Sequence, residues 1–174
     1  MKLSQLVLTA AGLMMCTGCS EMVSLHALVG DPEAIFDARL TGVWTLDDDV
    51  YIVRQDGNGY NISCLDKNSA PYKLKAKLLK AGDAGILDLT PASDDAFRIA
   101  AHTPLRVWVE GATLRMAFLD SKWLREHAGA QLATQEVDGR TLITATQEEL
   151  TRFLVAYGAD ERAYGNPTVL TRQQ

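Results

Sequence analysis

The stretch VYIVRQDGNGYNISCL, residues 50–65, has the pattern of a β-hairpin. Residues 50–55 and 59–65 are rich in β-branched and aromatic side chains, which are favoured in strands. Between them lies Asp-Gly-Asn-Gly, and both Asp-Gly and Asn-Gly favour tight hairpin turns because the central positions need positive φ. We therefore predict two antiparallel strands that are joined at this turn.

Short strand patterns of the same kind continue on both sides of this hairpin. Residues 72–78 alternate apolar side chains with lysines, which is typical of a strand with one buried face. Asp138-Gly139 marks a further hairpin turn. The remaining predicted strands cover residues 43–46, 85–89, 97–101, 105–109, 114–118, 131–137 and 140–144, and residues 168–171 are compatible with a further short strand at the end. About eight to ten strands at intervals of roughly 8 to 12 residues predict a mainly β, antiparallel barrel or sandwich.

Three helices are predicted to accompany the strands. Asp31-Pro32-Glu33 is typical of a helix start, with an aspartate cap followed by proline, and predicts a short N-terminal helix. A mid-chain helix is predicted over residues 120–127, which begin with another aspartate cap. Thr146 and Glu149 form a capping-box pattern, which predicts a C-terminal helix over residues 146–158.

The first residues have the composition of a secretory signal peptide. Lys2 supplies a positive start, and the mostly apolar run that follows is shorter than the about 20 residues that span a bilayer. Thr17-Gly18-Cys19 resembles the end of the lipobox of bacterial lipoproteins, in which the signal is removed just before the cysteine. The resemblance implies that Cys19 carries a diacylglyceryl thioether and usually an N-acyl chain such as palmitate.

The lipobox resemblance also implies how the chain is divided and where in the cell the protein is located. We predict a signal peptide over residues 1–18, a lipidated tether over residues 19–30 and a single β-rich domain over residues 31–174. Ser20, not aspartate, follows the cysteine. By resemblance to the sorting rule of Gram-negative lipoproteins, this favours a lipid anchor in the cell outer membrane, with the domain at the periplasmic face.

Gly42-Val43-Trp44, at the start of a strand that follows a short helix, resembles the first signature of lipocalins and other calycins. In that family the tryptophan packs across the closed end of the barrel, and a helix and a short strand follow the main strands. The family's arginine near the chain end corresponds to Arg172. The resemblance implies a lipocalin-like barrel that holds a small apolar ligand; the alternative is that Trp44 is a core residue of another β-rich fold.

The barrel interpretation predicts which side chains point inward. The residues predicted to line a ligand site are Trp44, Tyr60, Ile62, Leu74, Val107, Met116 and Phe118. Trp108 falls on the opposite face of its strand from Val107. We therefore expect that Trp108 is either covered by a helix or exposed as part of a contact surface.

Composition and motifs favour a binding protein over an enzyme. The formal net charge is −5 and no basic patch stands out, which argues against nucleic-acid binding. His26, His102 and His127 do not form a ligand pair, and no phosphate-binding, dinucleotide-binding or serine-nucleophile motif is found in the sequence. We therefore expect no enzymatic activity, no cofactor and no metal, although the acidic run 47–49 leaves calcium as an alternative. Cys64 is predicted to be a small buried hydrophobe.

Two hypotheses for function remain. In the first, the anchored barrel binds a small apolar ligand, which needs an internal cavity on the order of several hundred Å³. In the second, a lipoprotein with a solid β-core contacts or inhibits another periplasmic protein, through an exposed apolar patch near Trp108 or Trp123.

Overall fold

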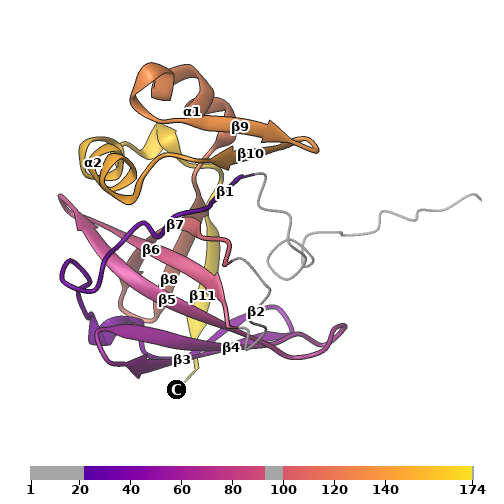
Figure 1. Cartoon of the computed structure of the whole chain (residues 1–174). Coiled ribbons are helices and arrows are strands. Elements are labelled where there is room, and N and C mark those ends of the chain that lie inside the picture. Colours follow the sequence, from indigo (N-terminus) through magenta and orange to yellow (C-terminus); the bar gives the residue numbers. More distant parts are fainter. Residues whose placement is uncertain (1–21, 93–99, 174) are drawn as a thin grey trace, which may run out of the picture.

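The computed structural model describes residues 22–92 and 100–173 (Figure 1). The predicted signal peptide, Cys19 and most of the predicted strand 97–101 lie outside the described residues.

Eight strands form a closed antiparallel barrel, which confirms the prediction of a mainly β, antiparallel fold. Seven of them follow one another around the barrel, and β11 closes it by pairing with both β8 and β2. The strands are β2 (Gly42–Leu46), β3 (Asp49–Asp56), β4 (Gly59–Leu65), β5 (Tyr72–Ala81), β6 (Ala84–Pro91), β7 (Thr103–Glu110), β8 (Thr113–Phe118) and β11 (Thr168–Arg172). The β3–β4 pair is the hairpin read from residues 50–65, with Val53 opposite Ile62.

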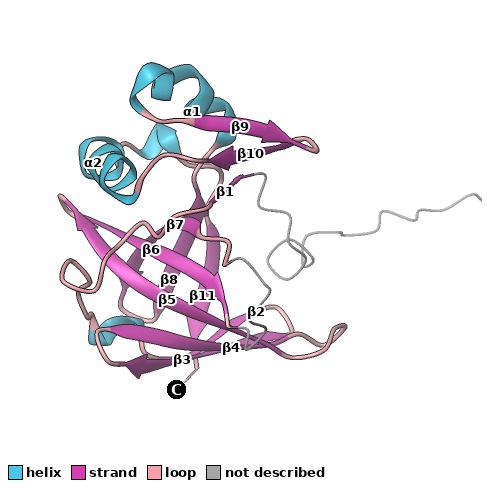
Figure 2. Cartoon of the chain, in the orientation of Figure 1, coloured by secondary structure: helices cyan, strands magenta, loops and turns pink. Residues whose placement is uncertain are grey.

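A second group of elements packs against the outer wall of the barrel and lies above it in Figures 1 and 2. It contains β1 (Met22–Ser24), α1 (Ser121–Ala128), β9 (Thr134–Val137), β10 (Arg140–Ile143) and α2 (Gln147–Tyr157), which we call the lobe. Within the lobe, β1 pairs in parallel with β10, and β10 pairs antiparallel with β9.

The molecule has two apolar cores because part of the barrel wall is buried on both faces. The inward side chains of the barrel form one core. The outward-facing Leu79, Ile86 and Ala117 join the lobe's apolar side chains in the other. Two short 3₁₀ helices, η2 (Gly129–Gln131) and η3 (Glu161–Ala163), connect elements of the lobe and barrel.

The mid-chain and C-terminal helices begin at the predicted caps. The Asp120 side chain accepts a hydrogen bond from the Trp123 N–H at the start of α1. At α2, Thr146 and Glu149 form both hydrogen bonds of the capping box. In the described part of the chain, neither α-helix has the length and apolar composition needed to cross a bilayer.

The predicted N-terminal helix is not seen. Residues 31–33 form a turn, and the following backbone pairs with the barrel, because the Ile35 N–H donates to the Leu78 carbonyl over 2.9 Å. Only a single 3₁₀ turn follows, η1 (Ala38–Leu40). The Leu78 carbonyl of the barrel thus accepts the hydrogen bond that the Ile35 N–H would have donated within a helix.

Residues 22–30, which we assigned to the lipidated tether, pack against the domain. Met22 and Ser24 are buried in β1, and Leu28 and Val29 are buried in the core beneath the lobe. The Leu28 N–H donates to the buried carboxylate of Asp88 over 2.9 Å. From Met22 onward, this segment is therefore part of the folded domain.

The barrel interior as a candidate binding site

One end of the barrel is closed by η1 and by Trp44, which is fully buried. The Trp44 indole Nε1 donates to the Leu40 carbonyl over 2.9 Å. The Arg172 guanidinium lies over the same ring, 4.1 Å from its centre. Its Nη1 donates to the Thr41 carbonyl over 2.6 Å and its Nη2 to the Arg39 carbonyl, so the last strand is tied to the turn that precedes the first.

The close approach of Arg172 explains the glycine two residues before Trp44. Gly42 has φ of 134°, a conformation that side chains with a Cβ rarely adopt. A Cβ at Gly42 would also collide with the Arg172 guanidinium. Glycine at this position therefore leaves room for the stacked arginine.

Tyr60 fixes the segment before η1 across the same closed end. Its hydroxyl accepts from the Asp37 N–H over 2.7 Å and donates to the Asp37 carbonyl over 3.2 Å. The Tyr60 ring stacks on Phe36, with ring centres 5.5 Å apart. Burial raises the pKa of the Tyr60 hydroxyl above its usual value.

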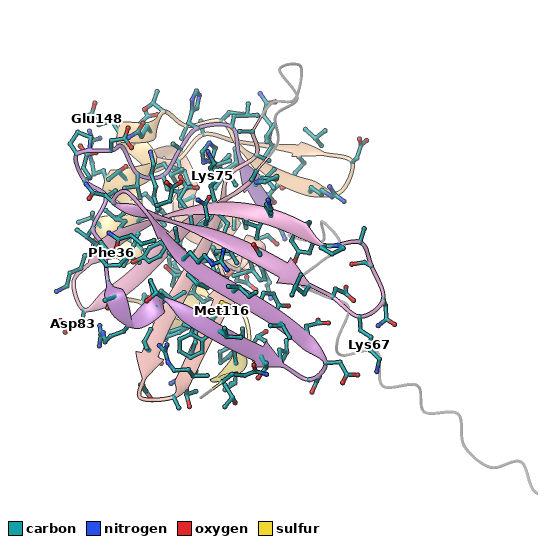
Figure 3. All side chains as sticks on the ribbon, turned by 90° about the horizontal axis from the view of Figure 1, so that it is seen from below. Phe36, Lys67, Lys75, Asp83, Met116 and Glu148 are labelled. Carbon is teal, nitrogen blue, oxygen red and sulfur yellow. The ribbon has the colours of Figure 1, made fainter. Side chains whose placement is uncertain are left out.

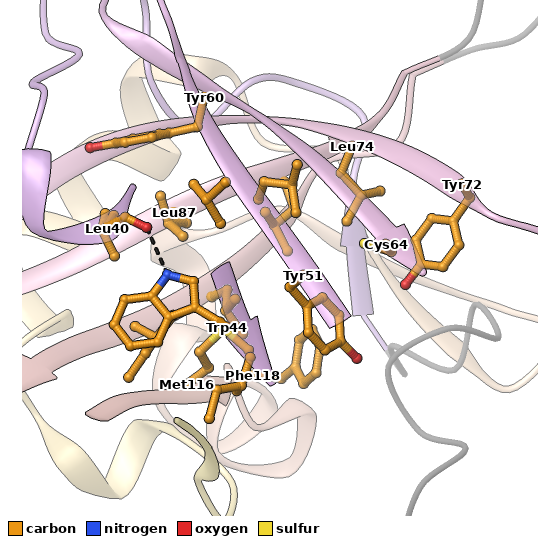
Figure 4. A pocket seen from close by; sticks show the side chains of 16 residues that line it. Leu40, Trp44, Tyr51, Tyr60, Cys64, Tyr72, Leu74, Leu87, Met116 and Phe118 are labelled. Atoms are coloured by element: carbon orange, nitrogen blue, oxygen red, sulfur yellow. Dashed lines mark hydrogen bonds between the residues drawn. The ribbon is translucent and has the colours of Figure 1, made fainter. Parts of the chain in front are cut away.

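The barrel encloses an apolar cavity of about 70 Å³ (Figure 4). Six of the seven residues predicted to form a ligand site line it; the exception is Val107, which is buried among the inward side chains beside it. The sixteen lining residues are Leu40, Trp44, Tyr51, Val53, Tyr60, Ile62, Cys64, Tyr72, Leu74, Leu87, Leu89, Leu105, Leu114, Met116, Phe118 and Leu170.

On β4, β5, β7 and β8, the lining residues that our sequence analysis missed follow the same alternation as the predicted inward residues on those strands. Cys64 lies two positions after Ile62 on β4, and Leu114 lies two positions before Met116 on β8. A strict period of two from any correctly assigned inward residue identifies them. Leu40, in η1, has no such signal, because it enters the cavity wall from outside the strands.

The lining of the cavity is less buried at the end opposite Trp44. In Figure 4, Tyr72, Leu74 and Cys64 lie away from the closed end that is marked by Trp44 and Leu40. Several residues near this end are only half-buried, in contrast to Trp44 and Leu40. These half-buried lining residues are Ile62, Tyr72, Leu74, Leu89 and Phe118. We call this half-buried apolar end of the barrel the mouth.

Acidic side chains border the β2–β3 turn next to the mouth. Asp48 forms an ion pair with Lys67, with 2.8 Å between Oδ2 and Nζ. Burial, together with the negative charge of Asp66 and of the neighbouring aspartates, raises the pKa of Asp49 above its usual value. Among the described residues, no group of acidic, histidine or cysteine side chains has the arrangement of a metal site.

The tryptophans that were expected to mark an exposed patch are covered. Trp123 is buried in α1 and stacks on His127, with ring centres 4.3 Å apart. Trp108 is half-buried on the outer wall, between the guanidinium groups of Arg106 at 4.4 Å and Arg115 at 5.0 Å. Trp123 is therefore not part of an exposed patch, and for Trp108 the alternative of a covered side chain agrees with its packing against the core of the lobe.

The histidines lie apart from the cavity. His102 Nδ1 is 2.9 Å from Asp88 Oδ1 on the outer wall of the barrel. His127 Nδ1 is 2.8 Å from the Trp123 carbonyl, and His26 donates its backbone N–H to the Ser24 hydroxyl. Each has a structural partner, and none of the three lines the cavity.

The chemistry of the cavity is that of an apolar binding site. The lining carries few polar atoms. Of these, the Trp44 indole N–H is hydrogen-bonded to the Leu40 carbonyl and the Tyr60 hydroxyl to the Asp37 backbone. Apolar cavities of this kind remain dry and accept apolar guests. No protein-family model, curated protein or solved structure significantly matches the chain.

Proposed function

We propose that the barrel binds the end of a single unbranched apolar chain, such as the acyl tail of a lipid. The observation that carries this proposal is the apolar cavity of about 70 Å³, which is closed at Trp44 and bordered by half-buried apolar side chains at the mouth. A chain that entered by its methyl end would leave its polar end outside, where the lining no longer excludes water.

The size of the cavity limits what the ligand is. A water molecule needs about 10–15 Å³ of such space, so the cavity has room for roughly five waters or for a few carbon atoms. Pockets for compact, drug-sized ligands are about 300–1,000 Å³. The proposal therefore excludes ring-bearing ligands and retains narrow chains whose ends alone enter the barrel.

The closed end supports a lipocalin-like interpretation of this barrel. Gly42 and Trp44, which belong to the motif that carries the resemblance, both lie against the Arg172 guanidinium, which also binds the turn before Gly42. In lipocalins the tryptophan packs across the closed end, as Trp44 does here. This similarity in arrangement supports ligand binding as the role of the interior, with no catalytic step.

We further propose that the protein is a lipoprotein, anchored through Cys19 to the periplasmic face of the outer membrane. The support is the sequence Thr17-Gly18-Cys19 after a short apolar run, with Ser20 next to it. One acyl chain holds a protein only marginally at a bilayer, whereas two or three hold it firmly. Replacing Cys19 by serine is expected to leave an unacylated precursor that no longer sediments with outer membranes.

The binding proposal is tested with the purified domain by native mass spectrometry. We expect a one-to-one complex with dodecanoic acid and none with retinol, whose ring is too wide for the cavity. Cys64→Leu adds side-chain volume inside the cavity and should abolish the complex. Ser63→Leu is the matched control, because Ser63 does not line the cavity. Absence of binding by the wild-type domain, or equal binding by both variants, would contradict the proposal.

The small volume also favours a second candidate function. A barrel whose interior is nearly filled is suited to present a rigid surface to another periplasmic protein, and then has no ligand of its own. The same experiment distinguishes the two proposals. The second predicts that the wild-type domain forms no complex with dodecanoic acid and that Cys64→Leu changes only the stability of the domain.

A further inference from the structure

The path of the chain from Cys19 into the fold leaves little room between a lipid anchor and the domain. Met22 is three residues after Cys19 and is already buried in β1. Because an extended chain spans at most about 3.5 Å per residue, the anchor lies within about 10 Å of Met22. The headgroup region on each side of the hydrocarbon core is itself several ångströms deep. The domain therefore has no spacer that would hold it away from the bilayer.

The segment Met22–Ser24 does not readily detach from the fold to lengthen the tether. Met22, Val23 and Ser24 pair with Thr141, Leu142 and Ile143 of β10. Ser24 also exchanges two backbone hydrogen bonds with His102, of 2.7 Å and 2.9 Å, on the side away from β10. Lengthening the tether would break these bonds and expose Met22. The edge of the lobe at β1 is thus fixed next to the anchor.

One face of the lobe's sheet is exposed beside this anchor point. Residues on the two faces alternate: Met22, Ser24, Thr141 and Ile143 are buried. On the other face, Val137 is 46% exposed and Val23 and Leu142 are half-buried. These three side chains line a shallow groove together with Asp138 and Arg140.

The charges on this face suit the interfacial region of a bilayer. Arg140 is exposed and forms no ion pair with any of the described residues, so its guanidinium is available for a lipid phosphate. Asp138, in the β9–β10 turn, offsets part of this charge. The other acidic side chain of this hairpin, Glu136, belongs to the opposite face, where it contacts Arg125 at 3.7 Å.

The β9–β10 turn of the lobe and the β4–β5 turn of the barrel project to the same side of the molecule. In Figure 1 the β9–β10 turn and the β4–β5 turn both project to the right, and Figure 3 shows Lys67 of the β4–β5 turn on that side. The closed end, with η1, lies at the left.

We propose that Val23, Val137, Arg140 and Leu142, which we call the membrane face, rest on the phospholipid surface to which Cys19 is anchored. The proposal rests on the proposed lipid anchor at Cys19. It adds an orientation: the exposed face of the lobe's sheet contacts the bilayer.

The test places a fluorophore on the full-length, acylated protein in vesicles of phosphatidylethanolamine and phosphatidylglycerol with brominated acyl chains. Val137→Cys carries the bimane label on the membrane face. Val155→Cys is the matched control, because Val155 is an exposed valine of α2, 54% accessible and outside the membrane face. Cys64 is buried, so the unsubstituted protein is expected to take up little label.

We expect severalfold stronger bromine quenching of the label at position 137 than of the label at position 155. Equal quenching at the two positions, in protein that is acylated and sediments with the vesicles, would overturn the orientation and leave the anchor intact. Protein whose mass shows no acyl group would overturn the anchor, and the orientation with it.

Discussion

The guanidinium of Arg172 lies 4.1 Å from the centre of the Trp44 ring and joins the last barrel strand to the first. The two residues are also directly opposite in the β11–β2 pair. The stacked guanidinium reaches past the ring to the carbonyls of Arg39, in η1, and of Thr41, which follows η1. One side chain thus closes the barrel seam and caps its closed end.

Arg172→Ala is expected to destabilise the domain by about 2–4 kcal/mol. The substitution removes two charge-assisted hydrogen bonds and a cation–π contact, and it leaves two carbonyls unpaired. Urea unfolding followed by circular dichroism measures the change. Arg54→Ala, at an exposed position of β3, is the control and is expected to change stability by less than about 0.5 kcal/mol. Equal effects of both substitutions would contradict this role of Arg172.

The local patterns in the sequence predicted local structure well. The Asp-Gly-Asn-Gly turn predicted the β3–β4 hairpin, and β4 has the predicted bounds, Gly59–Leu65. The capping box at Thr146 predicted the start of α2. Each of these signals depends on side chains within a few residues of the element, so no distant contact has to be known.

The parts that sequence reasoning missed depend on distant contacts. The helix expected after Asp31 is replaced by a bridge to the barrel, because Leu78 supplies the acceptor for the Ile35 N–H. Leu79 and Ile86 are apolar on the outer face of the barrel because the lobe covers them, a fact that alternation within one strand does not reveal. The volume of the cavity likewise depends on how sixteen side chains pack together, not on which residues point inward.

The contact between the lobe and the barrel is expected to depend on a glycine at the end of α2. A Cβ at Gly158 would collide with the Leu154 carbonyl and with Ile86 of the barrel wall. Gly158→Ala is therefore expected to cost about 1–3 kcal/mol through overpacking. Gly165→Ala is the matched control, because its nearest contact would be an ordinary 3.9 Å. Thermal unfolding compares the two; a similar effect of both would show that Gly158 is not a tight contact.

The buried carboxylate of Asp88 is expected to hold the N-terminal segment on the barrel. It accepts from the Leu28 N–H and lies beside His102 Nδ1, and Asp88 is only 3% exposed. Asp88→Ala leaves both donors unpaired in a buried place and should cost about 2–4 kcal/mol. Amide exchange at Leu28 should accelerate more than exchange in β3. Asp83→Ala, in the exposed β5–β6 turn, is the control and should leave Leu28 exchange unchanged.

Stability at alkaline pH is expected to depend on Tyr164. Burial raises the pKa of Tyr164 to about 12, from an ordinary value of 10.0. Because the pKa of Tyr164 is higher in the folded state than in the unfolded state, the neutral hydroxyl contributes to the free energy of unfolding. This contribution is fully present below pH 10 and is lost as the pH rises toward 12. Between pH 9 and pH 11 the wild type should lose about 1 kcal/mol relative to Tyr164→Phe, which lacks the ionisable group. Parallel stability curves for the two proteins over this range would contradict the assignment.

Enlarging the cavity is expected to change which molecules the barrel accepts. Leu105 is 2% exposed and lines the cavity, so Leu105→Ala should destabilise the domain by about 2–5 kcal/mol. The space it leaves joins the existing cavity of about 70 Å³, and an apolar cavity on the order of 150 Å³ stays dry and accepts benzene. A ligand that binds only the folded state restores stability by mass action. Benzene should therefore raise the melting temperature of Leu105→Ala but not that of the wild type or of Val169→Ala, whose side chain is 50% exposed on β11. If benzene stabilised all three proteins equally, the interior would not be the site at which it acts.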